Sequence, residues 1–466
     1  MKRRAIDDLI QWKNSNSGKL FLFTGAKGVG KTYLAYDFAR AFFERIFYIN
    51  FEREAGVNMI FQTRGKDDDV VNSIINYLTS DQNSFTESNV LILDEIYLTP
   101  DSVYNLTLLK DSGYFRYIIC LSSGPVSKEI KGFFCHKQLF PMEFDEFLLA
   151  TGNEWYIETI QTHFGTNKPI PDIVHKELLD LFRLYMQIGG MPGIINEYLS
   201  FNSLVNVPEQ HGLLIGAWHD YIQKKYPEGE AMRMNQVFDS LVLQLMKENK
   251  KFQYKLIRKG TTHSMYKDAI SQLLDRNYII RSTKISTEQL KKSRLEFYGD
   301  ISNNASGDTV NARDAVNASG DTINVPDDTV DALYDFSQEE GNTNFKLYMP
   351  DTGMLYTKIV EEQGITSNGQ TDKALLENFV AQSLQRKGYR LYFWESESMA
   401  KMDFLIRQKD TYLPIEVHCS DNTRSKSISV LKQIYDFPYA IKISSRNFEL
   451  SNQVKYVPYY AIFCLK

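Results

Sequence analysis

Cysteine is scarce in this sequence. The 466 residues include only 4 cysteines, none of them in a Cys-x-x-Cys pair: Cys120, Cys135, Cys419 and Cys464. This spacing predicts reduced, mostly buried thiols and argues against a disulfide framework. Two of the cysteines have a histidine neighbour, but adjacent side chains of a strand point to opposite faces and make poor joint zinc ligands.

Long apolar runs are also missing from the sequence. No stretch approaches the roughly 20 apolar residues that a membrane helix needs, and Asp7 and Asp8 follow the basic start where a signal peptide needs an apolar run. We therefore expect a cytoplasmic protein with no membrane partner. Neither sign of charge dominates, because 53 basic and 58 acidic residues leave a formal net charge of −5, which gives no whole-chain attraction for nucleic acid.

The sequence does contain an ordinary globular composition, 43% hydrophobic and 24% charged, in a length that predicts about three domains. In the first 150 residues, short apolar runs alternate with amphipathic segments such as 31–43 and 70–78. Continuous apolar runs of this length are typical of parallel strands buried on both faces, here at 19–24, 45–50, 89–94 and 117–122. Residues 1–150 are therefore predicted to form an open α/β sheet.

The remaining chain divides by composition into four parts. Residues 151–230 predict a helical lid subdomain, and the helix, turn, helix and strand pattern within 231–298 predicts a winged-helix-like unit. Residues 299–344 are rich in Asn, Asp, Gly, Ser and Thr and repeat the motif of 304–309 at 317–322, which predicts a low-complexity insertion without fixed order. Residues 345–466 again mix helices and strands and predict a C-terminal α/β domain.

A glycine-rich motif follows the first predicted strand and precedes a helix. Gly25-Ala-Lys-Gly-Val-Gly30-Lys31-Thr32 fits Gly-x-x-x-x-Gly-Lys-Ser/Thr, the phosphate-binding loop (P-loop) of nucleotide-binding proteins. Backbone N–H groups would converge there on an anion, Lys31 would reach the β- and γ-phosphates of ATP, and the Thr32 hydroxyl would ligate Mg²⁺. The predicted nucleotide-binding residues are Gly25, Ala26, Lys27, Gly28, Val29, Gly30, Lys31, Thr32 and Tyr33.

Polar residues end two of the later strands. Asp94 at the tip of 89–94 would hold Mg²⁺, and Glu95 just beyond it would polarise a water for attack on the γ-phosphate. The strand at 117–122 ends in Ser122 and Ser123, either of which is a candidate reader of the γ-phosphate; a simple strand-end turn explains the same Ser-Ser-Gly-Pro sequence equally well. Glu95, Lys31 and Ser122 are the predicted catalytic residues.

Taken together, these residues resemble a family of bacterial and archaeal AAA+-type ATPases with a C-terminal domain of unknown function. The resemblance includes two further elements, 140–147 (Phe-Pro-Met-Glu-Phe-Asp-Glu-Phe) and Gly189-Gly-Met-Pro192, and continues at Leu347-Tyr-x-x-Asp351-x-Gly353. It implies a P-loop ATPase core with the additional strand of the AAA+ group, and hydrolysis of ATP with Mg²⁺ coupled to domain rearrangement.

The chain departs from this family just before 140–147. The family carries a Gly-Arg pair there, whereas this chain reads Cys135-His-Lys-Gln-Leu139. Lys137 lacks the planar fork of arginine, which stabilises spread phosphoryl charge. The arginine would then come from a homo-oligomer or protein partner, or from within the chain, where Arg53 and Arg116 are alternatives.

Carboxylates in the C-terminal part resemble the PD-(D/E)XK nuclease, or restriction-endonuclease-like, fold. Glu377, Asp403 and Glu416 fall in a predicted helix and two predicted strands, and His418 stands where that fold has a lysine. The resemblance implies a metal-binding half with an altered third group, or a degenerate scaffold.

Three functions stay open at this level: a Mg²⁺-dependent ATPase, an ATP-switched DNA-binding or nuclease-like protein, and an ATP-binding switch with little turnover. DNA contacts would come from basic residues of the winged-helix-like unit, namely Lys247, Lys250, Lys251, Arg258 and Lys259.

Overall fold

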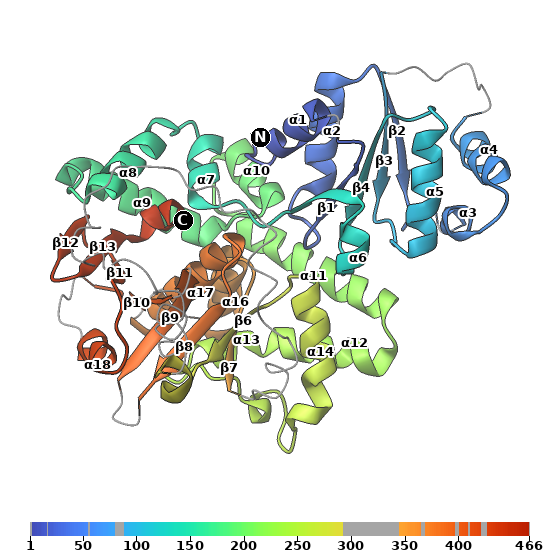
Figure 1. Ribbon diagram of the computed structural model, residues 1–466. Helices are drawn as coiled ribbons and strands as arrows, with labels where there is room; N and C mark the ends of the chain where they lie inside the picture. The colour runs from blue at the N-terminus through green and yellow to red at the C-terminus, as the bar shows by residue number, and fades with distance from the viewer. Residues whose placement is uncertain are drawn as a thin grey trace, which may run out of the picture.

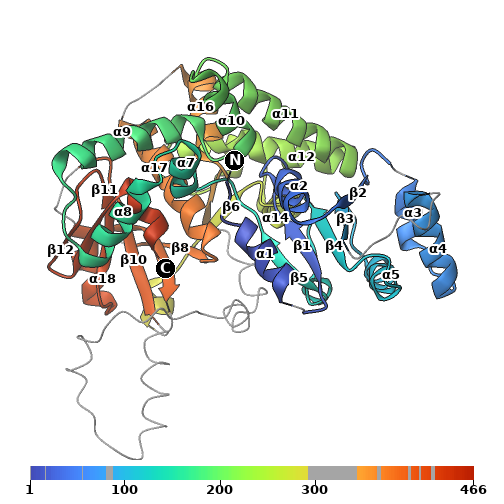
Figure 2. The same ribbon diagram turned by 90° about the horizontal axis from the view of Figure 1, so that it is seen from above.

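The computed structural model describes residues 2–15, 17–54, 56–79, 88–291, 344–364, 369–396, 400–408, 411–420 and 426–465. The repeats at 304–309 and 317–322 lie outside the described residues. A five-stranded sheet and an eight-stranded sheet lie at opposite ends of the molecule, with helices between and over them (Figures 1 and 2). In the described part of the chain, no helix combines the length and the apolar character needed to cross a bilayer.

The N-terminal sheet is entirely parallel and has the strand order β2-β3-β4-β1-β5. Its strands are β1 (Leu20–Thr24), β2 (Arg45–Asn50), β3 (Asn89–Asp94), β4 (Tyr117–Ser122) and β5 (Phe134–Gln138). The four strands predicted from apolar runs are confirmed. The fifth strand was not predicted: β5 lies at the sheet edge, and only its first residue is buried, so it carries no apolar run.

Helices cover both faces of this sheet. They are α1 (Ile6–Asn14), α2 (Lys31–Phe42), α3 (Val57–Gln62), α4 (Asp67–Leu78), α5 (Pro100–Asp111) and α6 (Lys128–Lys131). Alternate β1 residues point to the two faces: Phe21 and Phe23 pack in the core that contains α1 and α2, whereas Leu20 and Leu22 pack with α3 to α5. Burial on both faces explains why β1 reads as a continuous apolar run.

A run of helices connects the two sheets. It comprises α7 (Phe144–Ala150), α8 (Trp155–Thr166), α9 (Asp172–Ile188), α10 (Pro192–Phe201), α11 (Val207–Lys225), α12 (Glu228–Asp239), α13 (Leu241–Leu245), η2 (Tyr254–Leu256) and α14 (His263–Asp275). Helices α8 and α9 lie beside the C-terminal sheet, whereas α11 and α12 extend toward the N-terminal one (Figures 1 and 2).

The second sheet is mixed and has the order β12-β13-β11-β10-β9-β8-β6-β7. Its strands are β6 (Ile280–Lys284), β7 (Phe345–Tyr348), β8 (Leu391–Glu395), β9 (Lys401–Gln408), β10 (Thr411–Val417), β11 (Ala440–Ser444), β12 (Glu449–Ser451) and β13 (Val454–Pro458). Helices α16 (Thr352–Gln363), α17 (Gly369–Arg386) and α18 (Lys426–Ile434), and the terminal η4 (Tyr459–Cys464), accompany it.

Strand pairing crosses the predicted domain boundaries at 298 and 344. Strand β6 pairs antiparallel with β7, with Ile280 opposite Tyr348, and parallel with β8, with Ser282 opposite Leu391. The predicted helix, turn, helix and strand order is present as η2, α14 and β6, but its strand is built into the C-terminal sheet. A separate winged-helix unit and the other boundaries remain predictions.

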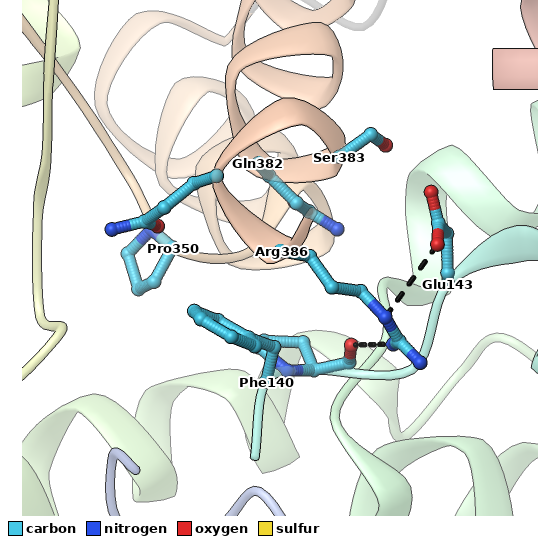
Figure 3. A pocket seen from close by; sticks show the side chains of 8 residues that line it. Phe140, Glu143, Pro350, Gln382, Ser383 and Arg386 are labelled. Carbon is cyan, nitrogen blue, oxygen red and sulfur yellow. Dashed lines mark hydrogen bonds and ion pairs between the residues drawn. The ribbon is translucent and has the colours of Figure 1, made fainter. Parts of the chain in front are cut away.

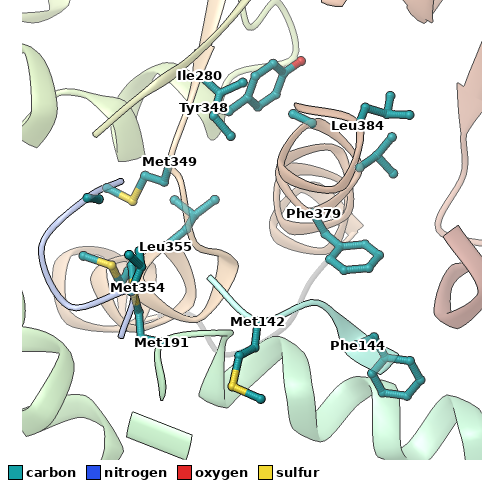
Figure 4. Packing of buried hydrophobic residues seen from close by; sticks show 14 of the residues in the cluster. Met142, Phe144, Met191, Ile280, Tyr348, Met349, Met354, Leu355, Phe379 and Leu384 are labelled. Carbon is teal, nitrogen blue, oxygen red and sulfur yellow. The ribbon is translucent and has the colours of Figure 1, made fainter. Parts of the chain in front are cut away.

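One apolar core runs from the N-terminal sheet to the C-terminal sheet. Around α17, it brings Phe379 and Leu384 together with Met142, Tyr348 and Met354, which come from segments far apart in the sequence (Figure 4). The long α17 is buried along most of its length, which explains its weak amphipathic pattern. The shared core ties the helical region to both sheets.

The Gly189-Gly190 turn packs closely against Met142 and Asp351 in this core. A Cβ atom on Gly190 would lie 2.1 Å from the carbonyl oxygen of Met142, so only glycine fits there. The Met142 N–H donates to the Gly190 carbonyl (2.6 Å), and the Gly190 N–H donates to the Asp351 carboxylate (2.6 Å). Asp351 also caps α16 by accepting from the Met354 N–H (3.0 Å). Burial raises the pKa of Asp351 to about 6.

Candidate nucleotide site

The glycine-rich loop lies between β1 and α2, at the carboxyl end of the parallel strands. Gly25, Gly28 and Gly30 all have positive φ (145°, 89° and 94°), which L side chains rarely adopt. A Cβ atom on Gly25 would meet the Leu139 carbonyl oxygen at 2.3 Å. Gly30 is the N-cap of α2, so this helix directs its free N–H groups toward the loop.

Lys31 begins α2, and its ammonium group is enclosed by the loop. The Nζ atom donates to the carbonyl oxygens of Gly25 (2.9 Å) and Ala26 (3.2 Å) and to the Ser123 hydroxyl (2.7 Å). Its distance to Glu95 Oε1 is 3.8 Å. Burial lowers the pKa of Lys31, although the charges of Glu95 and Asp94 oppose this shift. A desolvated cation of this kind favours an incoming anion such as a phosphate.

Asp94 is held so that one oxygen is engaged and the other is not. Its Oδ2 accepts from the Thr32 hydroxyl (2.9 Å) and from the Tyr48 hydroxyl (2.7 Å). Its Oδ1 is buried and has no hydrogen-bond partner in the described part of the chain. Burial is also the main cause that raises the pKa of Asp94. A buried carboxylate oxygen without a partner, beside a threonine hydroxyl, suits the oxygen preference of Mg²⁺.

Glu95 adopts a left-handed backbone conformation with φ of 57°. Both of its carboxylate oxygens accept from Ser123, Oε1 from the hydroxyl (2.5 Å) and Oε2 from the backbone N–H (3.1 Å). The neighbouring Ser122 hydroxyl instead accepts from the Gly124 N–H (3.2 Å), as in a local turn. Of the two serines weighed from sequence, Ser123 is the one that contacts Lys31 and Glu95, and a role for Ser122 remains a prediction.

These side chains open into a cavity of about 220 Å³. It is lined by Lys27, Gly28, Gly30, Lys31, Thr32, Tyr33, Asn50, Glu52, Asp94 and Glu95. The cavity thus unites most of the predicted loop residues with both strand-end carboxylates. Asn50, Glu52 and Tyr48 were not predicted; all three come from the end of β2 or just after it, and a polar strand end beside the loop was the available signal.

Helix α11 packs against the outer side of the loop. The Trp218 indole N–H donates to the Lys27 carbonyl (3.0 Å), and the Lys27 ammonium lies 4.4 Å from the centre of the Tyr221 ring. Lys27 also forms an ion pair with Glu52 (2.7 Å) across the mouth of the cavity. Sequence reasoning missed α11 here, because its contacts span about 190 residues and have no local pattern.

A buried charge network lies behind the loop. Arg3 donates to the Val29 carbonyl (2.8 Å) and pairs with Glu146 (3.1 Å), which is fully buried. Glu146 also pairs with Arg386 at the end of α17 (2.7 Å). Arg386 pairs with Glu143 (3.5 Å) and donates to the Pro141 carbonyl (2.9 Å) beside a small pocket (Figure 3). The network joins the P-loop to the C-terminal part.

None of the two arginines and the lysine considered from sequence is among the residues that line the cavity. Arg53 is exposed, and Lys137 pairs with Asp8 (3.2 Å). Arg116 stacks on Tyr117, 5.5 Å from its ring, at the start of β4. The loop lies at the other end of this strand, about 20 Å away at roughly 3.3 Å per residue, which places Arg116 out of reach.

The predicted C-terminal site is occupied by lysines. Glu377 is buried and lies near the ammonium groups of Lys250 (3.1 Å), Lys373 (3.4 Å) and Lys346 (3.8 Å). Asp403 pairs with the same Lys373 (2.9 Å). The ammonium of Lys373 therefore bridges the two carboxylates that a metal ion would share.

The other half of this predicted site lies one strand further along the sheet. Glu416 pairs with His418 (3.1 Å) and lies opposite Lys442 on the neighbouring strand β11. In the described part of the chain, no group of three or more His, Cys, Asp or Glu side chains is arranged to hold a metal ion. Lys373 already neutralises Glu377 and Asp403 where a metal ion would lie, and a nuclease-like role for these residues remains a prediction.

Two of the basic residues proposed for DNA contact also face inward. Lys250 is buried against Glu377, and Lys251 forms an ion pair with Glu395. Lys247, Arg258 and Lys259 are exposed. DNA binding remains a prediction that rests on these three.

Comparison with known protein families assigns a class to the N-terminal part. Residues 17–148 match the family model described as AAA domain, and residues 372–462 match the model described as Domain of unknown function (DUF4143). The N-terminal part is therefore an AAA-type domain of the P-loop ATPase class. No curated protein matches the chain.

Three solved structures show distant likeness. The Walker-type ATPase PABY2304 of Pyrococcus abyssi is 15% identical, with 60% of this chain and 90% of that chain covered and a TM-score of 0.36. AMPPCP-bound DnaA from Aquifex aeolicus is 12% identical, with 65% and 94% covered and a TM-score of 0.27. C. elegans PCH-2 is 18% identical, with 34% and 45% covered and a TM-score of 0.22. At these scores the likenesses carry no argument about function.

Proposed function

We propose that the chain is a Mg²⁺-dependent ATPase of the AAA+ type, whose nucleotide state is coupled to rearrangement of its domains. One observation carries this proposal: Lys31, Asp94 and Glu95 converge on a single cavity beside the glycine-rich loop, although they come from different elements. The match of residues 17–148 to the AAA domain supports the same conclusion.

Each residue has a distinct part in this proposal. The loop N–H groups and Lys31 bind the phosphates, with Gly25 to Tyr33 as the nucleotide-binding segment. Thr32 and Asp94 would hold Mg²⁺, which neutralises the charge of the β- and γ-phosphates when it is bound. The buried, unpartnered Oδ1 of Asp94 supports this assignment.

Glu95 is the proposed general base, and its partners set a condition for its action. Both oxygens of its carboxylate accept hydrogen bonds from Ser123, which holds the group toward that residue and not toward an attacking water. Glu95 would have to leave Ser123 before it could take a proton from the attacking water. Hydrolysis then requires a local rearrangement as well as bound ATP.

This arrangement also favours the second candidate, a switch that binds ATP and turns it over slowly. The tethered Glu95 is the specific observation in its favour. Turnover measured against protein concentration separates the two functions. A rate per protein that rises with self-association indicates that a partner completes the site, whereas a constant, very low rate indicates a switch.

The experiment pairs two variants with a control. Lys31→Ala should abolish ATP and ADP binding in calorimetry, whereas Glu95→Gln should retain binding and lose phosphate release. Lys176→Ala, at an exposed position on α9, should behave as the unaltered protein. Equal nucleotide binding by Lys31→Ala and the unaltered protein would refute the proposed function.

A further inference from the structure

Arg276 follows the last residue of α14 and contacts Ser123, the partner of Lys31 and Glu95 at the nucleotide site. Its guanidinium lies against the rings of Tyr221 (5.5 Å) and Tyr226 (5.0 Å). It donates to the hydroxyls of both tyrosines (3.1 Å and 2.6 Å) and, through Nη1, to the carbonyl oxygen of Ser123 (3.3 Å). The two rings and their hydroxyls hold the flat group in one orientation.

Ser123 is the residue that contacts both Lys31 and Glu95. Its hydroxyl accepts from the Lys31 ammonium (2.7 Å) and donates to Glu95 (2.5 Å). Arg276 donates a hydrogen bond to the backbone carbonyl of Ser123. The guanidinium is therefore one residue removed from both of the groups proposed to act on the γ-phosphate.

Arg276 forms no ion pair within 4 Å in the described part of the chain, although the carboxylate of the neighbouring Asp275 interacts with its charge. Its hydrogen-bond acceptors are a carbonyl and two phenols, all neutral. By contrast, Arg3, which is buried, and Arg386, which is partly buried, both pair with Glu146. A half-buried guanidinium with neutral partners binds an anion more strongly than it binds those partners, because charge-assisted hydrogen bonds are about twice as strong as neutral ones.

We propose that Arg276 is the positioning arginine of the nucleotide site. It acts within the same chain by holding Ser123, and its positive charge attracts the γ-phosphate of ATP. This inference rests on the proposed ATPase function. It supplies from α14 the arginine that the sequence lacks before 140–147. Without nucleotide, Arg276 fixes the Ser123 carbonyl; with ATP, its charge is drawn to the γ-phosphate and stabilises the charge that develops there during hydrolysis.

The same residue leads into the C-terminal sheet. The Asn277 side chain accepts a hydrogen bond from the Gln138 side chain (2.7 Å), and the Tyr278 ring stacks on Trp218 with 4.4 Å between ring centres. The indole N–H of Trp218 in turn donates to the Lys27 carbonyl of the glycine-rich loop. Strand β6 begins two residues later, at Ile280. A shift of Arg276 toward a phosphate is therefore transmitted directly to the eight-stranded sheet.

The test uses the full chain with ADP and a non-hydrolysable ATP analogue in calorimetry, together with steady-state turnover. Arg276→Ala should leave ADP affinity within about twofold, lower the preference for the ATP analogue by about tenfold or more, and reduce kcat by about 10²-fold or more, with a smaller change in KM. Arg276→Lys restores the charge without the planar fork and should recover only part of kcat. Arg116→Ala is the matched control and should change none of these quantities.

Tyr226→Phe separates positioning from simple packing. It removes the hydroxyl that accepts from Arg276 Nε but keeps the ring, so turnover should be retained or raised because the guanidinium is freer to move. If Tyr226→Phe lowers kcat as far as Arg276→Ala does, or if Arg276→Ala weakens ADP and the analogue equally, the inference is wrong. If Arg276→Ala acts as the unaltered protein while Lys31→Ala loses nucleotide, only this inference fails. Binding unaffected by Lys31→Ala overturns both.

Discussion

Replacing Glu146 by glutamine tests whether the buried charge network joins the P-loop to the C-terminal part. Glu146 is fully buried and interacts with Arg3 (3.1 Å), Arg386 (2.7 Å) and the backbone N–H of Arg4 (3.0 Å). Glutamine keeps the size of the side chain and removes its charge. Two arginines would then be left in the interior without the carboxylate that they share.

Two arguments give the size of the expected effect. Removing one partner of a buried ion pair costs about 3–5 kcal/mol, because the remaining charge stays desolvated. The pKa of Glu146 gives a second value for this cost. Burial alone would raise this pKa, but the charges of Arg3 and Arg386 lower it from 4.5 to about 2. At 1.36 kcal/mol per pKa unit, this shift corresponds to about 3 kcal/mol of stabilisation of the charged form. The two values agree.

Hydrogen exchange of the backbone amides in α7 and α17 is the suitable assay. The chain has several parts, so one melting temperature does not report on this site alone. Amide protection reports local opening free energy, and a loss of 3 kcal/mol corresponds to about a 150-fold fall in protection. We expect Glu146→Gln to lower protection in both helices by about 10² to 10³-fold.

The control is an exposed ion pair on the same helical region. Asp180 and Arg183 pair on α9 with 59% and 67% of their side chains exposed, and such pairs contribute at most about 1 kcal/mol. Asp180→Asn should therefore change protection by less than about fivefold. If Glu146→Gln also changes protection in α17 by less than fivefold, the network does not couple α17 to the loop, and the reasoning is refuted.

Three further predictions concern the turn, a buried carboxyl and the C-terminal cluster. Gly190→Ala should abolish soluble expression or cost several kcal/mol in urea unfolding, because its Cβ would lie 2.1 Å from a carbonyl oxygen, whereas Gly193→Ala, with nothing within 4 Å, should change stability by less than about 0.5 kcal/mol. Burial raises the pKa of Asp351 from 3.8 to about 6, so the native state holds this proton more tightly than the unfolded state. The protonated Asp351 carboxyl therefore adds about 3 kcal/mol to the free energy of unfolding below about pH 4, and this contribution is lost as the pH rises through 6. Urea unfolding measured from pH 4 to 7 should show this fall in the free energy of unfolding, and Asp351→Asn should not show it. In Lys373→Ala, Asp403 loses the ammonium at 2.9 Å, so calorimetry should show tighter Mn²⁺ binding to this variant than to the unaltered chain or to Lys373→Ala with Asp403→Asn.

The N-terminal sheet could be predicted from sequence because its local pattern reflects its environment. Strands buried on both faces become continuous apolar runs, as in β3, where every residue is buried. Strand β5 escaped prediction for the same physical reason, since an edge strand has little apolar requirement. The glycine-rich motif could be recognised in the sequence because its glycines with positive φ and the lysine at the start of the helix must stand at a fixed spacing.

The partners of the site residues could not be predicted in the same way. Tyr48 meets Asp94 across 46 residues, and Arg276 meets Ser123 across 153. Such contacts depend on how whole elements pack, and a single sequence carries no periodic trace of them. The C-terminal carboxylates failed as a metal prediction for two reasons. Lys250, which pairs with Glu377, is distant in the sequence, and Lys373, four residues before Glu377 on the same helix, pairs with both Glu377 and Asp403.

The geometry of α17 places a constraint on any nucleotide-driven movement. Arg386, at one end, is linked through Glu146 and Arg3 to the P-loop carbonyl of Val29. Glu377, nine residues earlier and about 13 Å along the helix, is linked to Lys250 in the segment that leads to α14. From the end of α14, Arg276 returns to Ser123 at the nucleotide cavity. The contacts form a closed circuit, so α14 cannot shift far while α17 stays fixed at Glu377, near its middle, and at Arg386, its last residue. If ATP moves Arg276, the strain must appear at the Lys250–Glu377 pair or at Arg386, and amide protection in α17 should change with nucleotide in the unaltered chain but not in Arg276→Ala.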